Sequence, residues 1–327
     1  MKVLVTGSTG FVGGNLVRAL KAKGYEIRVL VRKQSDDFTL RHIDVERVTG
    51  DLTDRESLER ALKDCEGLFH CAALYTFWNL DYREVYRVNV EGTKTILQEA
   101  IKAGVKKVVY TSSVATIGIP QKGLGTEDTE PTPANLIGHY KRSKYEAEQE
   151  AMKAVSMGLP VVVVNPTAPV GPWDVKPTPT GGIILDFLKG KIPAYVNTGL
   201  NIVDVEDVAT GHILAMEKGQ PGQRYILGNR NMTFKNLLDI LSNITGKKGP
   251  YFRIPITVLI ALGMIDELIE GKLLKKKPQI PLEGIRIARR PMYVTSRKAI
   301  QELGFPQNSP EVALENAVKW FRNNDRV

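Results

Sequence analysis

The chain begins with the stretch KVLVTGSTGFVG at residues 2–13, in which an apolar run leads straight into a glycine-rich loop. Residues 15–23 then have the apolar spacing of an amphipathic helix. A strand, a glycine turn and a helix in this order can hold a pyrophosphate, because free N–H groups at the helix start face the anion. An ordinary βα turn with extra glycines is the alternative, but the strand before the loop and the helix after it favour a dinucleotide site.

The three glycines of this loop have different expected roles. We expect Gly7 to permit the tight turn, Gly10 to let the backbone approach the phosphates and Gly13 to let helix and strand pack closely. The loop therefore predicts the first βα unit of a nucleotide-binding sheet.

Strands and helices alternate through the first half of the chain. Further strands are expected at residues 26–32, 45–49, 67–71, 106–110 and 161–164, and helices at 54–62, 84–103 and 137–155. The four consecutive valines of the last strand fit a sheet that is buried on both faces. This order predicts an α/β fold with a Rossmann-type, doubly wound parallel sheet.

The pattern changes after Asn165, where prolines interrupt the alternation. We expect residues 1–165 to form the dinucleotide-binding Rossmann domain, with residues 200–222 returning to it. Residues 166–199 and 223–327 are expected to form a smaller, C-terminal substrate-binding lobe.

The composition of the 327 residues is in the ordinary globular range, with 43% apolar and 25% charged side chains. Cys65 and Cys71 fit buried free thiols better than a disulfide scaffold. No two histidines have metal-ligand spacing, so we expect no metal site. The net charge of +9 permits nucleic acid, a membrane surface or a small anionic ligand. No basic run is interleaved with aromatics, so we expect no nucleic-acid partner.

Targeting signals and apolar segments bear on location. Met1 is followed almost at once by the first strand, which leaves no room for a signal peptide. The longest apolar stretch, residues 254–265, is interrupted by Pro255 and Gly263 and is too short to span a bilayer. We therefore expect a cytoplasmic protein without stable membrane insertion. The lysines within residues 272–277 fit the solvated end of a helix in the lobe, and the alternative is a helix that lies on a membrane.

Tyr140 and Lys144 lie four residues apart on an expected helix, so their side chains share one face. A neighbouring ammonium lowers the pKa of a phenol, whose usual value is about 10. Such a pair can pass a proton to or from a carbonyl or alcohol while a hydride moves. The alternative is a surface helix with a solvated lysine, and we expect Lys141 and Arg142 to be solvated in this way.

Ser112 and Ser113 follow the expected strand at residues 106–110. Ligands of open α/β sheets bind at the carboxyl ends of the strands. A hydroxyl there can hydrogen-bond a substrate oxygen, whereas the alternative is a serine that caps a turn.

Six motifs occur in a familiar order: TGxxGxxG at 6–13, Asp51-Leu52, CAA at 71–73, NVxGT at 89–93, TSS at 111–113, and YxxxK at 140–144. Together they strongly resemble the extended short-chain dehydrogenase/reductase family of the NAD-dependent epimerase/dehydratase type, over nearly the whole chain. The segments IGHYKRSK at 137–144 and KPTPTG at 176–181 are similar to hopanoid-associated sugar epimerases and, through them, to dihydroflavonol 4-reductases.

The resemblance implies roles for the matching residues. Ser113 would orient the substrate oxygen, and Tyr140 would be the acid/base. Lys144 would lower the pKa of that tyrosine and hold the nicotinamide ribose, and Asn89 would support the site from the long helix. The cofactor would be bound by Gly7, Thr9, Gly10, Phe11, Val12, Gly13, Asp51, Leu52, Ala72, Ala73, Tyr140, Lys144, Pro166 and Thr167. The resemblance also implies a homodimer through the helices at 84–103 and 137–155.

The residues after the second strand bear on the choice between NAD and NADP. An acidic residue there would accept a hydrogen bond from the ribose 2′-hydroxyl. This chain has Arg32 and Lys33, and a guanidinium suits a 2′-phosphate. We therefore expect both residues to bind the cofactor and expect NADP rather than NAD. The alternative is two solvated residues in a loop that also carries Asp36 and Asp37.

Three functions follow from these expectations. The first is an NADP-dependent oxidoreductase that reduces a ketone, as dihydroflavonol 4-reductases do. The second is a redox-neutral epimerase or dehydratase acting on a nucleotide sugar. Asn165 and Asp204 depart from the arginine and histidine common in sugar-nucleotide enzymes and speak against it. The third, a dinucleotide sensor without turnover, is disfavoured because Tyr140 and Lys144 are both present.

Overall fold

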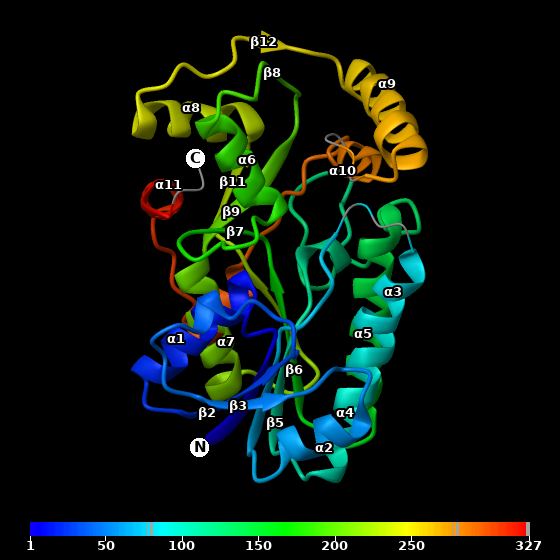
Figure 1. The fold of residues 1–327 in the computed structure, drawn as a ribbon, viewed down its shortest axis with the longest axis vertical. Helices are drawn as coiled ribbons and strands as arrows, with labels where there is room; N and C mark the ends of the chain where they lie inside the picture. Colours follow the sequence, from blue (N-terminus) through cyan, green and yellow to red (C-terminus); the bar gives the residue numbers. More distant parts are fainter. Residues whose placement is uncertain (77, 79–80, 277, 279–280, 325–327) are drawn as a thin grey trace.

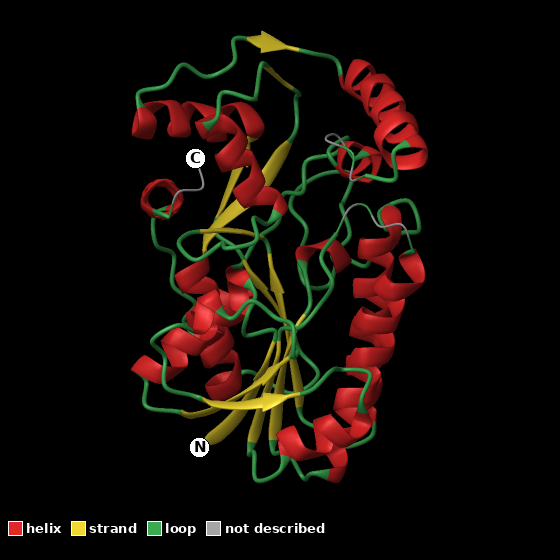
Figure 2. Cartoon of the chain, in the orientation of Figure 1, coloured by secondary structure: helices red, strands yellow, loops and turns green. Residues whose placement is uncertain are grey.

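A computed structural model of the chain describes residues 1–76, 78, 81–276, 278 and 281–324. Its centre is a seven-stranded sheet with the strand order β10-β6-β5-β4-β1-β2-β3, shown in Figures 1 and 2. Every pair of neighbouring strands is parallel. The strands are β1 (Lys2–Thr6), β2 (Glu26–Val31), β3 (Glu46–Thr49), β4 (Gly67–His70), β5 (Lys107–Thr111), β6 (Val161–Pro166) and β10 (Arg224–Leu227). The predicted doubly wound parallel sheet is confirmed.

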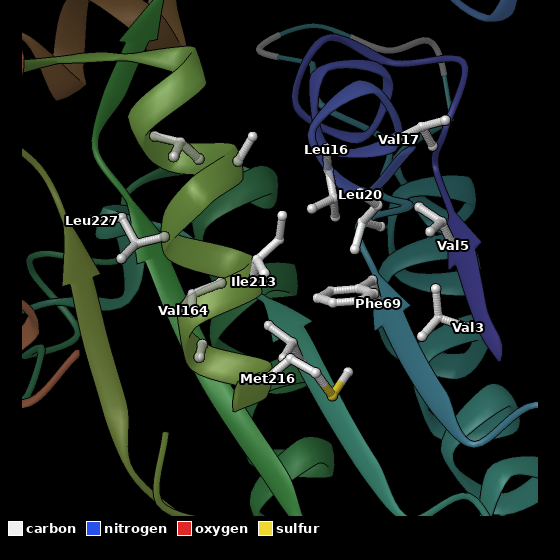
Figure 3. Close-up of a cluster of buried hydrophobic side chains, with 14 of the residues drawn as sticks. Val3, Val5, Leu16, Val17, Leu20, Phe69, Val164, Ile213, Met216 and Leu227 are labelled. Carbon is white, nitrogen blue, oxygen red and sulfur yellow. The ribbon is translucent and has the colours of Figure 1, made fainter. Parts of the chain in front are cut away.

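Helices cover both faces of this sheet. Helices α1 (Phe11–Ala22) and α7 (Val205–Lys218) lie side by side on one face, and α2 (Arg55–Leu62), α4 (Gly92–Lys102) and α5 (Gly138–Ser156) cover the other (Figure 1). Figure 3 shows side chains of α1 and α7, among them Leu20 and Ile213, turned toward the strands, with Phe69 of β4 between them. Burial of this apolar surface on both faces fixes the strand ends that carry the site.

The helix expected at residues 84–103 is divided in the structure. It consists of α3 (Tyr82–Tyr86), a π-helical turn η2 (Arg87–Glu91) and α4. A π-turn inserts one residue into the helical repeat and often lies at a functional site. Here it carries Asn89, whose amide faces inward.

Two strands differ in place from the sequence expectation. Residues 200–222 were expected to return to the dinucleotide-binding domain, but their strand, β9 (Gly199–Asp204), pairs with β7 (Ala168–Val170) and β11 (Arg230–Thr233) in a separate three-stranded sheet. Conversely, β10 was expected in the C-terminal lobe and is the edge strand beside β6. Both are short apolar runs, and such runs do not reveal which sheet they join. The division into a dinucleotide-binding domain and a substrate lobe stays a prediction.

The three-stranded sheet is packed by α6 (Pro179–Leu188), α8 (Phe234–Thr245) and α11 (Pro310–Asn323) around their own apolar core. The remaining elements are η1 (Phe38–Leu40), η3 (Val114–Thr116), β8 (Ala194–Tyr195), β12 (Phe252–Arg253), α9 (Ile256–Asp266), η4 (Glu267–Leu273), α10 (Leu282–Ile287) and η5 (Ala299–Leu303). Among the described residues, no helix is both long and apolar enough to cross a membrane.

Candidate active site

The three-stranded sheet, its helices α6, α8 and α11, and the elements α9, η4 and α10 are here called the upper lobe (Figure 1). A cavity of about 760 Å³ lies between it and the seven-stranded sheet. Its lower part is lined by the glycine loop, by Ser112 and Ser113 after β5, and by Pro166 and Thr167 at the end of β6. Tyr140 and Lys144 enter from α5. The site predicted at the carboxyl ends of the strands therefore lies in this cavity, which continues into an upper part that is lined by the upper lobe.

The glycine loop has the close approaches that its sequence predicts. Gly7 has a φ of +71°, and a Cβ there would lie 2.6 Å from the backbone nitrogen of Ala72. A Cβ on Gly13 would lie 2.2 Å from the carbonyl oxygen of Gly7, so helix α1 can pack here only with glycine. The Gly10 N–H donates to that same carbonyl over 2.9 Å and closes the turn.

The start of α1 is suited to an anion. Gly10 is its N-cap and provides no side-chain hydrogen bond, so the first N–H groups of the helix have no side-chain acceptor from that residue. Within the described residues, the Ser112 hydroxyl lies buried without a hydrogen-bond partner and lines the cavity. Buried polar groups without partners are rare, so these features fit a polar ligand such as a dinucleotide.

Other residues expected to bind the cofactor fall into two groups. Thr9, Phe11, Val12, Ala73, Pro166 and Thr167 line the cavity together with the glycines. Arg32, Lys33, Asp51, Leu52 and Ala72 are not part of that lining. Ala72 backs the turn at Gly7, and Leu52 is buried against Gly92 of α4.

Arg32 and Lys33 are exposed directly after β2. Burial acts to raise the pKa of the Asp51 carboxyl, but the pKa is lowered overall, and the positive charge of Arg32 is one of the influences that lower it. Hydrogen bonds from the Thr53 backbone and hydroxyl, at 2.9 and 2.7 Å, lower the same pKa more strongly. Arg32 and Asp51 therefore flank the same edge of the sheet.

Tyr140 lies in the first turn of α5 with 8% of its surface exposed. Burial raises the pKa of its phenol to about 12, and a hydrogen bond with the Ser113 side chain opposes this rise. Ser113 also caps η3 by accepting a hydrogen bond from the Ala115 N–H over 3.1 Å. The structure thus brings together the tyrosine and the serine that the sequence predicts.

Lys144 lies one turn further along α5 and is 2% exposed. Its ammonium donates to the Tyr110 hydroxyl over 3.0 Å and to the Thr111 carbonyl over 2.8 Å. Burial lowers the pKa of Lys144 to about 8, although the charge of Glu148 opposes this.

The expected lowering of the Tyr140 pKa by Lys144 is not found in this structure. The phenol is buried, and its lost solvation outweighs the other influences on its pKa. The ammonium is directed to β5 by its two hydrogen bonds. At neutral pH Tyr140 is therefore a protonated phenol.

Asn89 lies behind the cavity wall and is 1% exposed. Its side-chain oxygen accepts from the Leu74 N–H over 2.7 Å, and its nitrogen donates to the Leu74 carbonyl over 3.1 Å and to the Ser143 hydroxyl over 2.9 Å. Asn89 thus connects the loop after β4 to α5 through these hydrogen bonds. A role in supporting the site, as the resemblance implies, stays a prediction.

Lys141 was expected to be solvated, but in the structure it is buried. It is 4% exposed and lines the cavity, and its ammonium lies 3.4 Å from the Met292 sulfur. Burial lowers its pKa to about 8, while the charge of Glu283 raises it. The upper lobe covers this side of α5, and helical spacing alone cannot reveal that cover.

Glu283, which the sequence did not indicate, lies beside the cavity, next to the lining residue Gly284. From α10, it accepts a hydrogen bond from the His139 N–H over 3.3 Å at the start of α5. The helix has no side-chain cap of its own at Ile137. A Cβ on Gly138, which has a φ of +84°, would lie 2.0 Å from the Glu283 carboxyl carbon. Burial raises the pKa of Glu283 to about 7.

In the described part of the chain, no group of three or more His, Cys, Asp or Glu side chains is arranged to hold a metal ion. Cys65 and Cys71 are both free thiols. Burial raises the pKa of Cys71 to about 11, so the thiolate is disfavoured.

Comparison with known proteins gives a consistent answer. The sequence profile of the NAD dependent epimerase/dehydratase family matches residues 3–228. The "Putative dihydroflavonol 4-reductase" of Synechocystis sp. is 47% identical, covering 99% of this chain and 95% of the relative. "Sterol demethylase protein B" of Methylococcus capsulatus is 37% identical over the full length of both chains, each covered to 100%.

The crystal structure of gox2253 is 41% identical and superposes with a TM-score of 0.88, covering 99% of each chain. Its likeness extends over both the seven-stranded sheet and the upper lobe. With the glycine loop, the strand-end serines and the Tyr140–Lys144 pair in one cavity, the chain belongs to the NAD dependent epimerase/dehydratase family of extended short-chain dehydrogenases/reductases and is an enzyme.

Proposed function

We propose that this enzyme is an NADP-dependent oxidoreductase that reduces a ketone on a large, mainly apolar substrate. The observation that carries the proposal is the upper part of the cavity. Its lining includes Val196, Leu200, Phe234, Leu259, Ile285 and Met292. Apolar walls with a few polar groups at one end suit a ligand whose reactive oxygen faces Tyr140. The names of two relatives, a dihydroflavonol 4-reductase and a sterol demethylase protein, are compatible with such a substrate.

The protonation state of Tyr140 suits the direction of reduction. A phenol with a pKa of about 12 holds its proton at neutral pH and can donate it to a ketone oxygen as that oxygen gains charge. Ser113, which hydrogen-bonds the phenol, would orient the same oxygen. A bound nicotinamide cofactor supplies the hydride. Lys144 would then hold the nicotinamide ribose by leaving one of its present partners on β5.

Arg32 supports NADP as the cofactor. Its guanidinium is exposed just after β2, where the ribose of a dinucleotide in this fold lies. Lys33 beside it adds a second cation. A 2′-phosphate would gain charge-assisted hydrogen bonds at this position, whereas the 2′-hydroxyl of NAD would meet no carboxylate from these two residues.

Epimerisation or dehydration of a nucleotide sugar is the second candidate. Arg290 lines the upper part of the cavity and could contact a diphosphate, which favours it. The Asn165 side chain is engaged within the protein, because its amide donates to the Ser113 carbonyl over 3.1 Å and to the Glu148 carboxylate over 3.0 Å. Asp204 caps α7 through the Glu206 N–H over 2.9 Å. Both side chains therefore hold parts of the protein together, which disfavours a role for either of them in binding a nucleotide sugar.

A deuterium-transfer experiment distinguishes these functions. The enzyme is incubated with NADPH that carries deuterium at the transferable position and with a panel of flavanonol and steroid ketones. The proposal predicts a deuterated alcohol and one NADP⁺ for each product molecule. Conversion of UDP-glucose without net oxidation of the cofactor, together with NAD(H) retained through purification, would instead support the epimerase. Cofactor binding without turnover of any ketone or sugar would support a sensor.

A further inference from the structure

The upper lobe exposes an unusual amount of apolar surface in one segment. Most of the large apolar side chains that the described residues expose lie between residues 251 and 274. Phe252 is 74% exposed, Ile265 55% and Leu273 72%. Figure 1 shows α9 at the rim of the lobe, where it packs against α10 and η4. Contiguous exposed apolar surface marks a site of interaction.

Helix α9 itself has the composition of a buried helix. Its sequence, ITVLIALGMID, has no charged residue before Asp266. A helix that is apolar on all sides is normally enclosed by protein or by lipid. Here Val258, Leu262 and Met264 are each about half exposed, at 47%, 48% and 57%. Something outside the described chain is therefore needed to cover them.

The charges next to this surface indicate what covers it. Lys272, Lys275 and Lys276 are all exposed directly after the apolar run, whereas Glu267 and Glu270 are partly buried. An apolar helix followed by a cluster of lysines is suited to the boundary between acyl chains and anionic headgroups. A second copy of the chain is the alternative occupant, and the variants below distinguish it from a bilayer.

Helix α9 also forms part of the upper wall of the cavity. Leu259 of α9 lines it, together with Ile285 and Ile287 of α10. The exposed apolar surface is therefore the outer side of the segment whose inner side faces the candidate substrate. This continuity would place a bound membrane next to the apolar part of the cavity.

We propose that residues 256–276 form a peripheral docking surface for an anionic lipid bilayer. The apolar side chains of α9 and η4 enter the headgroup region, and the lysines contact lipid phosphates. No helix crosses the bilayer in this arrangement, in agreement with the lengths of the described helices. The proposal does not depend on the identity of the reaction in the cavity.

Flotation of the full chain with vesicles tests the proposal without measuring activity. The vesicles contain phosphatidylcholine with or without phosphatidylglycerol, at low salt. We expect the protein to float with the anionic vesicles and to be released by high salt. Failure of the unmodified protein to float with the anionic vesicles would overturn the proposal.

Two sets of variants locate the surface. The triple change Lys272→Glu, Lys275→Glu and Lys276→Glu should reduce flotation about tenfold, and so should Leu262→Gln with Ile265→Gln. The matched control Lys63→Glu, Lys122→Glu and Lys189→Glu changes the net charge equally at exposed lysines elsewhere and should float normally. Equal losses in both lysine triples would contradict a localised surface. Normal flotation of the Leu262/Ile265 variant, with a shift from a larger to a smaller species in gel filtration, would show that a second copy covers the surface instead.

Discussion

Tyr140 keeps its proton in this site because burial raises the pKa of its phenol to about 12. The sequence correctly indicated which residues meet, since Tyr140 and Ser113 share a hydrogen bond. The expected direction of the pKa shift was the opposite one, a lowering by Lys144. The spacing of Tyr140 and Lys144 is a local property, whereas desolvation depends on everything that covers the helix.

Arg32 provides a test of cofactor choice at the scale of one residue. Arg32→Asp should weaken NADP binding by about tenfold to a hundredfold, because it removes charge-assisted hydrogen bonds to the 2′-phosphate. The same change should improve NAD binding, since the new carboxylate can accept from the ribose hydroxyl. Dissociation constants for both cofactors, measured by calorimetry, check this.

Arg41→Asp is the matched control, because Arg41 lies in the same loop and stacks on Phe38, with its guanidinium carbon 4.5 Å from the ring centroid. It makes the same change of charge away from β2. If Arg32→Asp leaves the ratio of NADP to NAD affinity unchanged, the assignment of Arg32 is wrong.

Glu283 should make the stability of the protein depend on pH. Its folded-state pKa of about 7 lies above the usual 4.5, so between these values the folded state holds a proton that the unfolded state releases. This contribution to stability is present at low pH and is lost as the pH rises through about 7. Relative to Glu283→Gln, the wild-type protein should therefore lose a few °C of melting temperature as the pH rises from about 5 to about 8.

Glu59→Gln, at an exposed position of α2, serves as the control and should follow the wild-type curve. Parallel curves for the wild type and Glu283→Gln across this pH range would mean that the Glu283 carboxyl does not carry the shift.

The elements with strong local signals were predictable. The helix expected at residues 54–62 is α2, and the Asp54 side chain caps it by accepting from the Ser57 N–H. The valines of β6 are buried, as their run predicts. The π-turn at Arg87–Glu91 was not predicted, because one inserted residue barely alters the apolar spacing of a long helix. The exchanged places of β9 and β10 depend on contacts far apart in the chain.

The turn between β1 and α1 provides a test at the scale of the element. Gly13→Ala places a Cβ 2.2 Å from the Gly7 carbonyl, so the strand and helix must separate. We expect it to cost about 1–3 kcal/mol of stability and to weaken cofactor binding at least about tenfold. Thermal unfolding and cofactor titration measure the two effects.

Gly182→Ala in α6 is the matched control, because a Cβ there would meet nothing within 4 Å. Alanine favours the helix and should stabilise the protein by up to about 1 kcal/mol without affecting cofactor affinity. Normal cofactor binding by the Gly13→Ala protein would contradict the proposed role of the turn.

At the scale of the whole molecule, the site is formed where the upper lobe covers the start of α5. Glu283 and Met292 reach α5 from this lobe, and they bury Lys141, which the sequence had indicated as solvated. Helical periodicity identifies faces but not what lies over them, so these contacts could not be predicted. The homodimer, the cytoplasmic location and the similarity to hopanoid-associated epimerases stay predictions.

The central claim is that Tyr140 transfers the proton in a hydride-transfer reaction. Its most direct test is the Tyr140→Phe variant, assayed for ketone reduction beside a titration with NADPH. Because the ring still fills its place and only the proton donor is lost, kcat should fall by about 10²–10⁴-fold. The dissociation constant of NADPH should stay within about twofold of the wild-type value, a change worth under 1 kcal/mol. Turnover within a few-fold of the wild type, with NADPH still bound, would contradict the account.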